Sequence, residues 1–324
     1  MEVQVAWQIG RFDERDVPEL VQFWNAEFAS WRMFRPLTED WLRIRVMGRA
    51  AFDPSGFYIA RAGGSVVGLG HAAKSGTEAY VSMLYVVPGQ RRQGIGTALI
   101  SCLQPVLDSA RETRAAAVVL DPVYGTGFDV QGSKGLRCRP QWGGPRLSLF
   151  GSCEGIGVPT RDLETVNFLL KRGFRMGDPD LSMRLEGMRP GEFEQPQNLR
   201  ARGRRFDIRI HENRSPWGAE GYQWEIPHRC VQLLGGDKPV GGLTWCHWDD
   251  FTAILYDFSL MEQVRGLGLG RAVLSHALAD MAQAGCTACE LNTGSSRNAR
   301  AVGIYRAAGF RIAEAWQTFH GQGG

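Results

Sequence analysis

The sequence predicts two α/β domains in tandem, and three observations support this prediction. The chain has 324 residues, which is more than a single domain usually holds. The phrase R-x-x-G-x-G occurs twice, at residues 91–96 and 265–270. Around each copy, a β-like run leads into the glycines and a helical pattern follows them. A repeated strand–turn–helix phrase of this kind indicates a duplicated fold.

The composition is that of an ordinary globular protein, with 44% hydrophobic and 22% charged residues. The net charge of +3 is too small to argue for nucleic acid or a membrane surface as a partner. No run approaches the ~18 apolar residues of a membrane span, and the first residues lack the layout of a signal peptide. We therefore expect neither a nucleic-acid nor a membrane partner, and the oligomeric state stays open.

Cysteine usage predicts a reducing, cytoplasmic location. The chain has seven cysteines, an odd number, and no export signal. Cys286 and Cys289 form a lone C-x-x-C, and a zinc site would need a second ligand pair that the sequence does not offer at a suitable spacing. We expect ordinary, partly buried thiols and no metal site.

The first half divides into strands, helices and one irregular stretch. Asp13 is the expected N-cap of an amphipathic helix, and Gly63 with Gly64 is a two-residue hairpin signal. The stretch from about 123 to 160 is rich in Gly, Pro, Arg and aromatic residues and indicates an inserted loop, whereas residues 187–204 are typical of a linker. We expect strands at 5–12, 56–62, 65–75, 79–87, 115–122, 174–177 and 181–185. Helices are expected near 13–24, directly after Thr38, and at 94–111 and 160–173.

The second half repeats this order in less space. Between Ile208 and Cys230 there is room for one short helix, where the first half has two. The two halves are therefore expected to share a fold but not all of their helices. Strands are expected at 230–236, 239–248, 252–260, 287–294 and 310–319, and helices at 268–285 and 298–309.

The repeated phrase has the composition of a phosphate site that is lined by backbone. Glycines let the main chain approach an anion, and the first N–H groups of a helix point at it with the helix dipole behind them. A Rossmann turn would need a third glycine, but Leu99 and Val273 stand in its place. A Walker A loop would need G-K-[ST], and Gly132-Ser133-Lys134 has the wrong order. Neither of these nucleotide-binding loops fits.

Both halves resemble the GCN5-related N-acetyltransferases (GNAT superfamily), in which R/Q-x-x-G-x-G/A holds the pyrophosphate of acetyl-coenzyme A (acetyl-CoA). The second half also carries a later motif of that family, N-x-x-A-x-x-x-Y-x-x-x-G-F, as Asn298, Ala301, Tyr305, Gly309 and Phe310. The tandem arrangement resembles mycothiol synthase and its two-domain relatives. The resemblance implies two acyl-CoA N-acyltransferase domains of α/β (α+β) type, each with a mixed, mostly antiparallel sheet and flanking helices.

The resemblance also suggests domain boundaries. An N-terminal domain spans residues 1–186, with the insertion at about 123–160. The linker 187–204 follows. A C-terminal domain spans residues 205–324 and has a shortened N-terminal helical region.

Acetyl-CoA is the cosubstrate that the resemblance implies, and each half offers a binding segment. In the C-terminal half, the implied binding residues are Phe258, Ser259, Leu260, Val264, Arg265, Gly266, Leu267, Gly268, Leu269, Gly270, Arg271 and Asn298. A second CoA in the N-terminal half would use Leu84, Tyr85, Val86, Arg91, Arg92, Gln93, Gly94, Ile95, Gly96 and Thr97.

Acetyl transfer to an amine requires two proton movements. The acceptor ammonium must lose a proton, because a lysine-like amine has a pKa of ~10.4, and the leaving thiolate gains from a nearby acid. In the family, a tyrosine after the fifth strand commonly supplies that acid, and Tyr305 matches it, whereas its counterpart in the first half is Leu169. Asp257, eight residues before Arg265, matches a carboxylate that many relatives use as a base, whereas Met83 stands at that place in the first half.

These contrasts predict that the C-terminal half is catalytic and that the N-terminal half is a binding or structural copy. Glu290, on the strand 287–294, is the runner-up for the base. One alternative is a non-catalytic acyl-CoA sensor or scaffold. Another is an acetyltransferase whose active half is the N-terminal one, with a base from its insertion. The acceptor, an amine-bearing small molecule or peptide, is not identified by the sequence.

Overall fold

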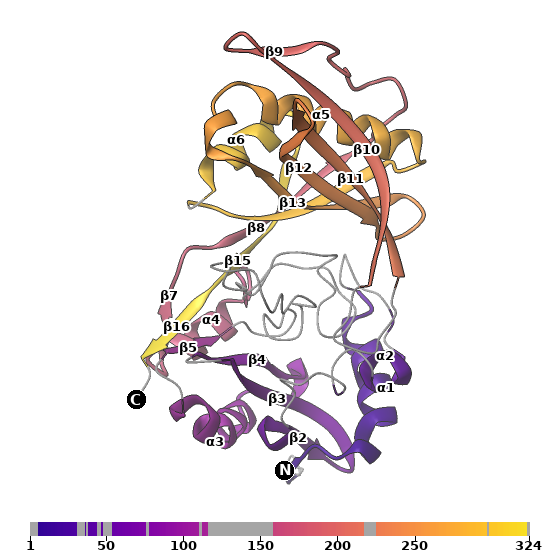
Figure 1. Cartoon of the computed structure of the whole chain (residues 1–324). Coiled ribbons are helices and arrows are strands. Elements are labelled where there is room, and N and C mark those ends of the chain that lie inside the picture. Colours follow the sequence, from indigo (N-terminus) through magenta and orange to yellow (C-terminus); the bar gives the residue numbers. More distant parts are fainter. Residues whose placement is uncertain are drawn as a thin grey trace. The chain divides into compact units, whose positions relative to one another are not determined.

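The structure, a computed structural model, contains two compact units (Figure 1). Of the described residues, those up to 180 and those from 316 onwards belong to the first unit, and those from 181 to 315 belong to the second. Within these ranges, the structure describes residues 6–30, 36, 38–43, 47, 54–75, 78–109, 112–115, 158–216, 225–296 and 298–322.

The first unit is built on a seven-stranded sheet with the strand order β1-β2-β3-β4-β5-β16-β7. β4 and β5 pair in parallel, whereas β1 to β4 form an antiparallel meander. The strands are β1 (Trp7–Arg11), β2 (Phe57–Ala62), β3 (Ser65–Ser75), β4 (Glu78–Val86), β5 (Glu112–Ala115), β7 (Arg175–Met176) and β16 (Phe319–Gln322). The helices are α1 (Val17–Phe28), α2 (Glu39–Leu42), α3 (Ile95–Asp108) and α4 (Leu163–Leu170).

α1 begins where the sequence predicts, after a cap at Asp13. The Asp13 carboxylate accepts from the backbone N–H of Arg15, and the Asp16 carboxylate accepts from the backbone N–H of Asp13 in return. This reciprocal cap closes a 3₁₀ turn that leads into the helix. The buried face of α1 repeats at helical spacing and consists of Val17, Leu20, Trp24 and Phe28.

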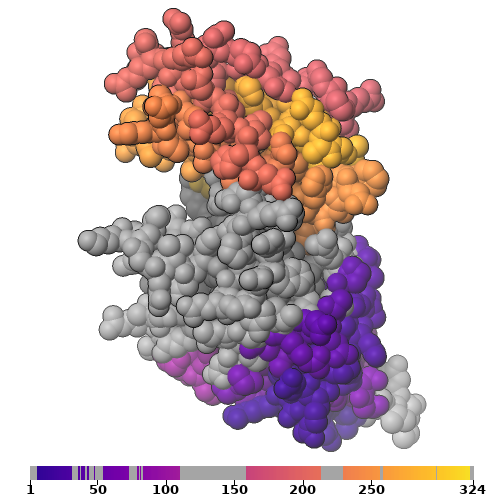
Figure 2. Space-filling model, turned by 45° about the vertical axis from the view of Figure 1, so that its right-hand side comes forward, coloured from indigo at the N-terminus to yellow at the C-terminus, as the bar shows by residue number. Residues whose placement is uncertain are grey.

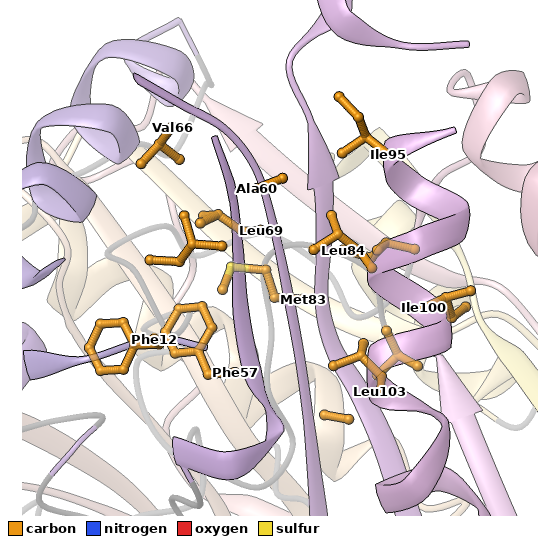
Figure 3. Packing of buried hydrophobic residues seen from close by; sticks show 14 of the residues in the cluster. Phe12, Phe57, Ala60, Val66, Leu69, Met83, Leu84, Ile95, Ile100 and Leu103 are labelled. Atoms are coloured by element: carbon orange, nitrogen blue, oxygen red, sulfur yellow. The ribbon is translucent and has the colours of Figure 1, made fainter. Parts of the chain in front are cut away.

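α1 and α3 cover opposite faces of the first sheet. Figure 3 shows Ile95 and Leu103 of α3 beside Leu84 on one side of the strands. Phe12 and Phe57 lie on the other side, with ring centroids 4.6 Å apart (Figure 3). Apolar side chains therefore fill both sides of this sheet, and the core of the first unit is continuous around it.

The second unit contains most of a nine-stranded sheet with the order β6-β15-β8-β14-β13-β12-β11-β10-β9. β13 and β14 pair in parallel, and β9 to β13 pair antiparallel in succession. The strands are β6 (Val158–Pro159), β8 (Asp180–Glu186), β9 (Leu199–Ala201), β10 (Arg204–Pro216), β11 (Glu225–Gly235), β12 (Lys238–His247), β13 (Thr252–Leu260), β14 (Ala288–Gly294) and β15 (Arg311–Gln317). Its helices, α5 (Leu269–Gln283) and α6 (Ala299–Ala307), lie on one face of that sheet (Figure 1).

The two halves of the sequence exchange their last strands. β16, from the end of the chain, lies between β5 and β7 and pairs antiparallel with both. β8, from the first half, lies between β15 and β14. Leu181 and Met183 of β8 are buried in the core of the second unit, and Phe319 of β16 is buried in that of the first. Each sheet is thus completed by a strand from the other half.

The fold class is confirmed, and most elements lie where the sequence predicts them. The range 208–230 is strand up to Pro216 and again from Glu225, strands that the sequence did not predict, and the eight residues that could hold the expected short helix lie outside the described residues. The predicted linker contains β9, and the expected last strand breaks at Thr318 into β15 and β16. The boundaries at 186 and 205 stay predictions.

The insertion lies outside the described residues, apart from its last three. In the described part of the chain, no helix is both long and apolar enough to cross a membrane.

Candidate active site

The second glycine turn is held in shape by its arginine. Nε of Arg265 donates to the carbonyl oxygen of Leu260, the last residue of β13, at 2.8 Å. Gly266 and Gly268 have φ angles of +75° and +79°, which L side chains rarely adopt. Gly268 is the N-cap of α5, so the turn delivers the chain directly into that helix.

This turn presents backbone N–H groups that have no backbone partner. A glycine N-cap has no side chain to accept from the first helical N–H groups, and the first turn of α5 contains no acidic residue. In the described hydrogen bonds, Arg271 N–H donates to Gly268, whereas the N–H groups of residues 266–270 have no backbone partner. A Cβ built on Gly266 or Gly268 meets nothing within 4 Å. The turn therefore has open space and backbone donors of the kind that helix N-termini present to anions.

β13 and β14 separate beside this turn. Their parallel pairing runs only from Thr252 with Ala288 to Leu255 with Leu291, although β13 continues to Leu260. β13 also carries a β-bulge opposite β12, because two of its residues stand opposite Leu243 alone. These two are Asp257 and Phe258. The sheet therefore opens into a fork between β13 and β14, with the bulge on one arm and the glycine turn at its end.

Tyr305 lies on α6 within the core of the second unit. Its side chain is 5% exposed, and its ring centroid lies 6.1 Å from that of Phe258 and 5.8 Å from that of Phe310. The aromatic contact with Phe258 places Tyr305 next to the bulge. Asp257 lies in β13, but its side chain is outside the described part of the structure.

Glu290 is fully buried and paired. Its side chain is 0% exposed, and its carboxylate lies 3.3 Å from the guanidinium of Arg184 on β8. Two residues further along β14, Asn292 accepts a short hydrogen bond from Ser182, also on β8. The exchanged strand therefore supplies polar partners to β14 where the fork begins.

The first glycine turn has the same internal geometry. Nε of Arg91 donates to the carbonyl oxygen of Val86, again the last residue of the preceding strand, at 3.0 Å. Gly94 is the N-cap of α3 with φ +87°, and Arg92 adopts φ +66° where the second turn has Gly266. The two turns are therefore structural copies.

The surroundings of the first turn differ at Gly94, where a tryptophan lies beside the turn. Trp7 Nε1 donates to the carbonyl oxygen of Gln93 at 3.1 Å, and a Cβ on Gly94 would lie 3.8 Å from the Trp7 ring, whereas one on its counterpart Gly268 meets nothing within 4 Å. The next glycine does not distinguish the turns, because a Cβ on Gly96 would meet the ring of Phe168 at 3.5 Å and one on Gly270 would meet Ile304 at 3.5 Å. Arg172 lies 3.8 Å from the centroid of the Phe168 ring and donates to Thr97.

An acidic residue neutralises the first turn. Glu164 in the first turn of α4 lies 3.1 Å from Arg91 and 3.4 Å from Arg92. α6 is the counterpart of α4, and its second residue is Arg300, where α4 has Glu164. The charge at this place is thus reversed between the two halves.

Side chains of the strand that leads to the first turn are also buried or hydrogen-bonded. Leu84 is buried, and the hydroxyl of Tyr85 donates to Glu27 of α1 at 2.9 Å. Burial, and then this carboxylate, raise the pKa of Tyr85 well above its usual range. Tyr85 therefore keeps its proton and serves to hold α1 on the sheet.

Comparison with known proteins identifies the family. The sequence profile described as "Acetyltransferase (GNAT) family" matches residues 18–124 and again residues 199–310. The chain belongs to the GNAT family. A comparison with curated proteins gave no match.

Solved structures share the tandem GNAT fold over almost the whole chain. A "Tandem GNAT protein from the clavulanic acid biosynthesis pathway" is 15% identical, with a TM-score of 0.62. The match covers 98% of this chain and 99% of that one. A GCN5-related N-acetyltransferase from Sphaerobacter thermophilus is 12% identical, with a TM-score of 0.59 and coverage of 97% and 95%.

A GCN5-related glucosamine N-acetyltransferase region of a fungal multi-domain β-N-acetylglucosaminidase is also similar. It is 14% identical, with a TM-score of 0.61, and the match covers 98% of this chain but 38% of that one. At these identities the likeness shows the fold alone.

In this GNAT chain, the C-x-x-C does not form part of a metal cluster among the described residues. Cys286 and Cys289 are both buried, at 1% and 0% exposure. Burial raises the pKa of Cys286 to about 11 and that of Cys289 well above its usual range. Both thiols therefore stay protonated near neutral pH.

Sequence reasoning missed the residues that other elements bring to the turns. Ser182 and Arg184 belong to the first half, and nothing in their own strand indicates that they join β14. Glu164 and Arg300 carry a usable signal, since aligning the two halves on their G-F pairs places one opposite the other. This reversal of charge between the repeats indicates that the two turns differ in their surroundings.

Proposed function

We propose that this protein is an acetyl-CoA-dependent N-acetyltransferase whose C-terminal half performs the reaction on an amine. One observation carries the proposal: the second glycine turn is open with Arg300 on the neighbouring helix, whereas the first has Trp7 beside it and is neutralised by Glu164. An open turn with added positive charge suits a pyrophosphate.

In this proposal, acetyl-CoA binds along the fork and the second turn. The backbone N–H groups of residues 266–270 receive the pyrophosphate, and the separated edge of β13 beyond Leu255 offers main-chain groups to the rest of the cofactor. The other contact residues are those that the resemblance implies: Phe258, Ser259, Leu260, Val264, Arg265, Arg271 and Asn298. Support comes from the N–H groups without a backbone partner at the turn and from the loss of pairing between β13 and β14.

The acceptor amine attacks the thioester carbonyl carbon, so that a C–N bond forms and the C–S bond breaks. Asp257, on the bulged part of β13, takes the proton that the ammonium must lose. Tyr305 gives its proton to the departing thiolate, because a phenol with a pKa of ~10 is protonated at neutral pH. The second proton of the attacking nitrogen leaves as the amide forms and restores the phenol. The contact between Tyr305 and Phe258 supports placing both groups at the fork.

Glu290 remains the alternative base. Its ion pair with Arg184 and its complete burial favour a different role, in which it anchors β8 against β14. We therefore assign the proton transfer to Asp257.

The N-terminal half is proposed to be a structural copy that binds no second CoA. Trp7 and Glu164 occupy the surroundings of its turn, and its counterparts of the catalytic pair are Met83 and Leu169, both 0% exposed. The acceptor is a small amine or a peptide, the location is cytoplasmic, and no nucleic acid, membrane or metal takes part.

The reaction is tested by thiol release from acetyl-CoA across a panel of amines, with calorimetric titration of CoA in parallel. We expect turnover with at least one amine, and we expect Arg265→Glu to abolish both binding and turnover. Binding without turnover across the panel favours a sensor or scaffold. Loss of turnover on changing Gly94 and Gly96, with Tyr305→Phe fully active, places the chemistry in the N-terminal half.

A further inference from the structure

The face of the second sheet that lies opposite α5 and α6 carries an open row of polar side chains. The pairing register places Arg209 of β10 beside Gln232 of β11, Gln232 beside Gly242 of β12, and Gly242 beside Ser259 of β13. Directly paired residues point to the same face. Their chain neighbours Ile208, Val231, Leu243 and Leu260 pack in the helix-covered core, so this row points away from the helices.

The corresponding face of the first sheet is covered. Tyr85, six residues before Arg91, donates to Glu27 of α1 and is thereby closed off. Ser259 stands six residues before Arg265 and is exposed. In the described part of the second unit, no helix lies on this face. The row therefore leads from the arm of the fork across three strands without a helix above it.

The row has a glycine without a side chain in its middle and an arginine at its far end. Gly242 has no side chain, and a Cβ there would lie 2.5 Å from the carbonyl oxygen of Val231, so only glycine fits. Arg209 is exposed, and it has no ion pair or hydrogen bond in the described structure. Asp207, the nearest carboxylate along β10, is bound instead by Arg205, at 3.1 Å. In Figure 2 the red segments of the second unit, among them β10, lie at its surface.

A second polar residue lies at the same end of the row. His211 lies two residues from Arg209 on the same face, and it pairs with Cys230 across the strands.

We propose that this row binds the acceptor, and that the acceptor is an extended amine with a carboxylate at its far end, of about tetrapeptide length. This inference rests on the function proposed above. Arg209 lies three strands from β13, which is ~14 Å at a strand spacing of about 4.8 Å. An extended chain of four residues spans about the same distance, at roughly 3.4 Å per residue. The amine then lies at the fork while the carboxylate meets Arg209.

The test compares tetraglycine with tetraglycine amide as acceptors for the full chain. We expect kcat/KM to be about tenfold higher for the free carboxylate, as a charge-assisted hydrogen bond allows. Arg209→Gln should remove this preference by raising the KM for tetraglycine, with the KM for acetyl-CoA unchanged. Arg205→Gln is the matched control, because the Arg205 guanidinium is already paired with Asp207. This variant should keep the preference.

Three results overturn the inference: equal use of the acid and the amide by the wild type, an unchanged preference in Arg209→Gln, or equal use of glycine and tetraglycine. Failure of the enzyme proposal is distinguishable, because no amine would then release thiol. In that case, calorimetric titration of tetraglycine in the presence of CoA shows whether the row binds the peptide. Binding that Arg209→Gln weakens about tenfold supports the site, and absence of binding overturns it.

Discussion

Glu164 and Arg91 form an ion pair of 3.1 Å across the first glycine turn, and at the place of Glu164 the second half carries Arg300. The turns share their arginine-to-carbonyl bond and their left-handed glycine N-cap, so the backbone is conserved between them. What differs is the charge delivered by the following helix, Glu164 in one half and Arg300 in the other. An intramolecular carboxylate neutralises the first turn, whereas Arg300 adds a positive charge beside the second.

This difference predicts one CoA per chain. Calorimetry should give a stoichiometry of one, and Arg300→Glu should weaken CoA binding about tenfold or more, because a charged hydrogen-bond partner contributes about 1.5–3 kcal/mol. Arg306→Glu, an exposed site in the last turn of the same helix, is the matched control. A stoichiometry of two, or equal weakening by both variants, would show that this assignment of the turns is wrong.

Tyr305→Phe should lower kcat by about 10²–10⁴-fold, as expected for loss of a general acid, with little change in CoA affinity. The ring packs against Phe258 and Phe310, and phenylalanine keeps those contacts, so the melting temperature should change little. Rates from thiol release and affinities from calorimetry separate the two effects. Retention of the full rate would mean that Tyr305 only packs.

The strand exchange predicts that a residue of the first half stabilises the second unit. Met183 on β8 is 0% exposed within that unit's core, so Met183→Asp would bury a charge without a partner. We expect loss of CoA binding at the second turn and a loss of stability of about 3 kcal/mol or more. Met176→Asp, on β7 of the same half and 55% exposed, should change neither. Equal behaviour of the two variants in thermal unfolding and calorimetry would argue against the exchange.

Local patterns predicted most elements but not the neighbours of every strand. The strand 252–260 was placed correctly because its apolar run ends at the glycine turn, and Asp13 was a readable cap. The exchange of β8 and β16 was not predictable, because alternation fixes which face of a strand is buried and says nothing of which sheet it joins. The strand around Ile208 was not predicted, because its many charged residues make the alternation of buried and exposed positions hard to recognise.

The candidate site was partly predictable, because some of its features lie within one segment of the sequence. The glycine turns and the positions of Asp257 and Tyr305 follow from spacing along one segment. The contact of Trp7 with the first turn joins residues distant in sequence, which only the fold brings together.

Cys286 predicts a specific dependence of stability on pH. Burial, with smaller effects of Asp249 and Asp280, raises the pKa of its thiol from 9.0 to about 11. The folded state therefore keeps the proton to higher pH than the unfolded state does. The stabilisation is fully present below pH 9 and is lost as the pH rises towards 11, because the unfolded thiol ionises first.

Chemical denaturation of the wild type and of Cys286→Ala between pH 7 and 11 measures this contribution. The difference in unfolding free energy between them should be constant up to about pH 9 and should then shrink, by at most about 1.4 kcal/mol per pH unit. Other titrating groups cancel because both proteins contain them. Parallel curves for the wild type and Cys286→Ala would mean that this thiol is not shielded from water in the folded protein.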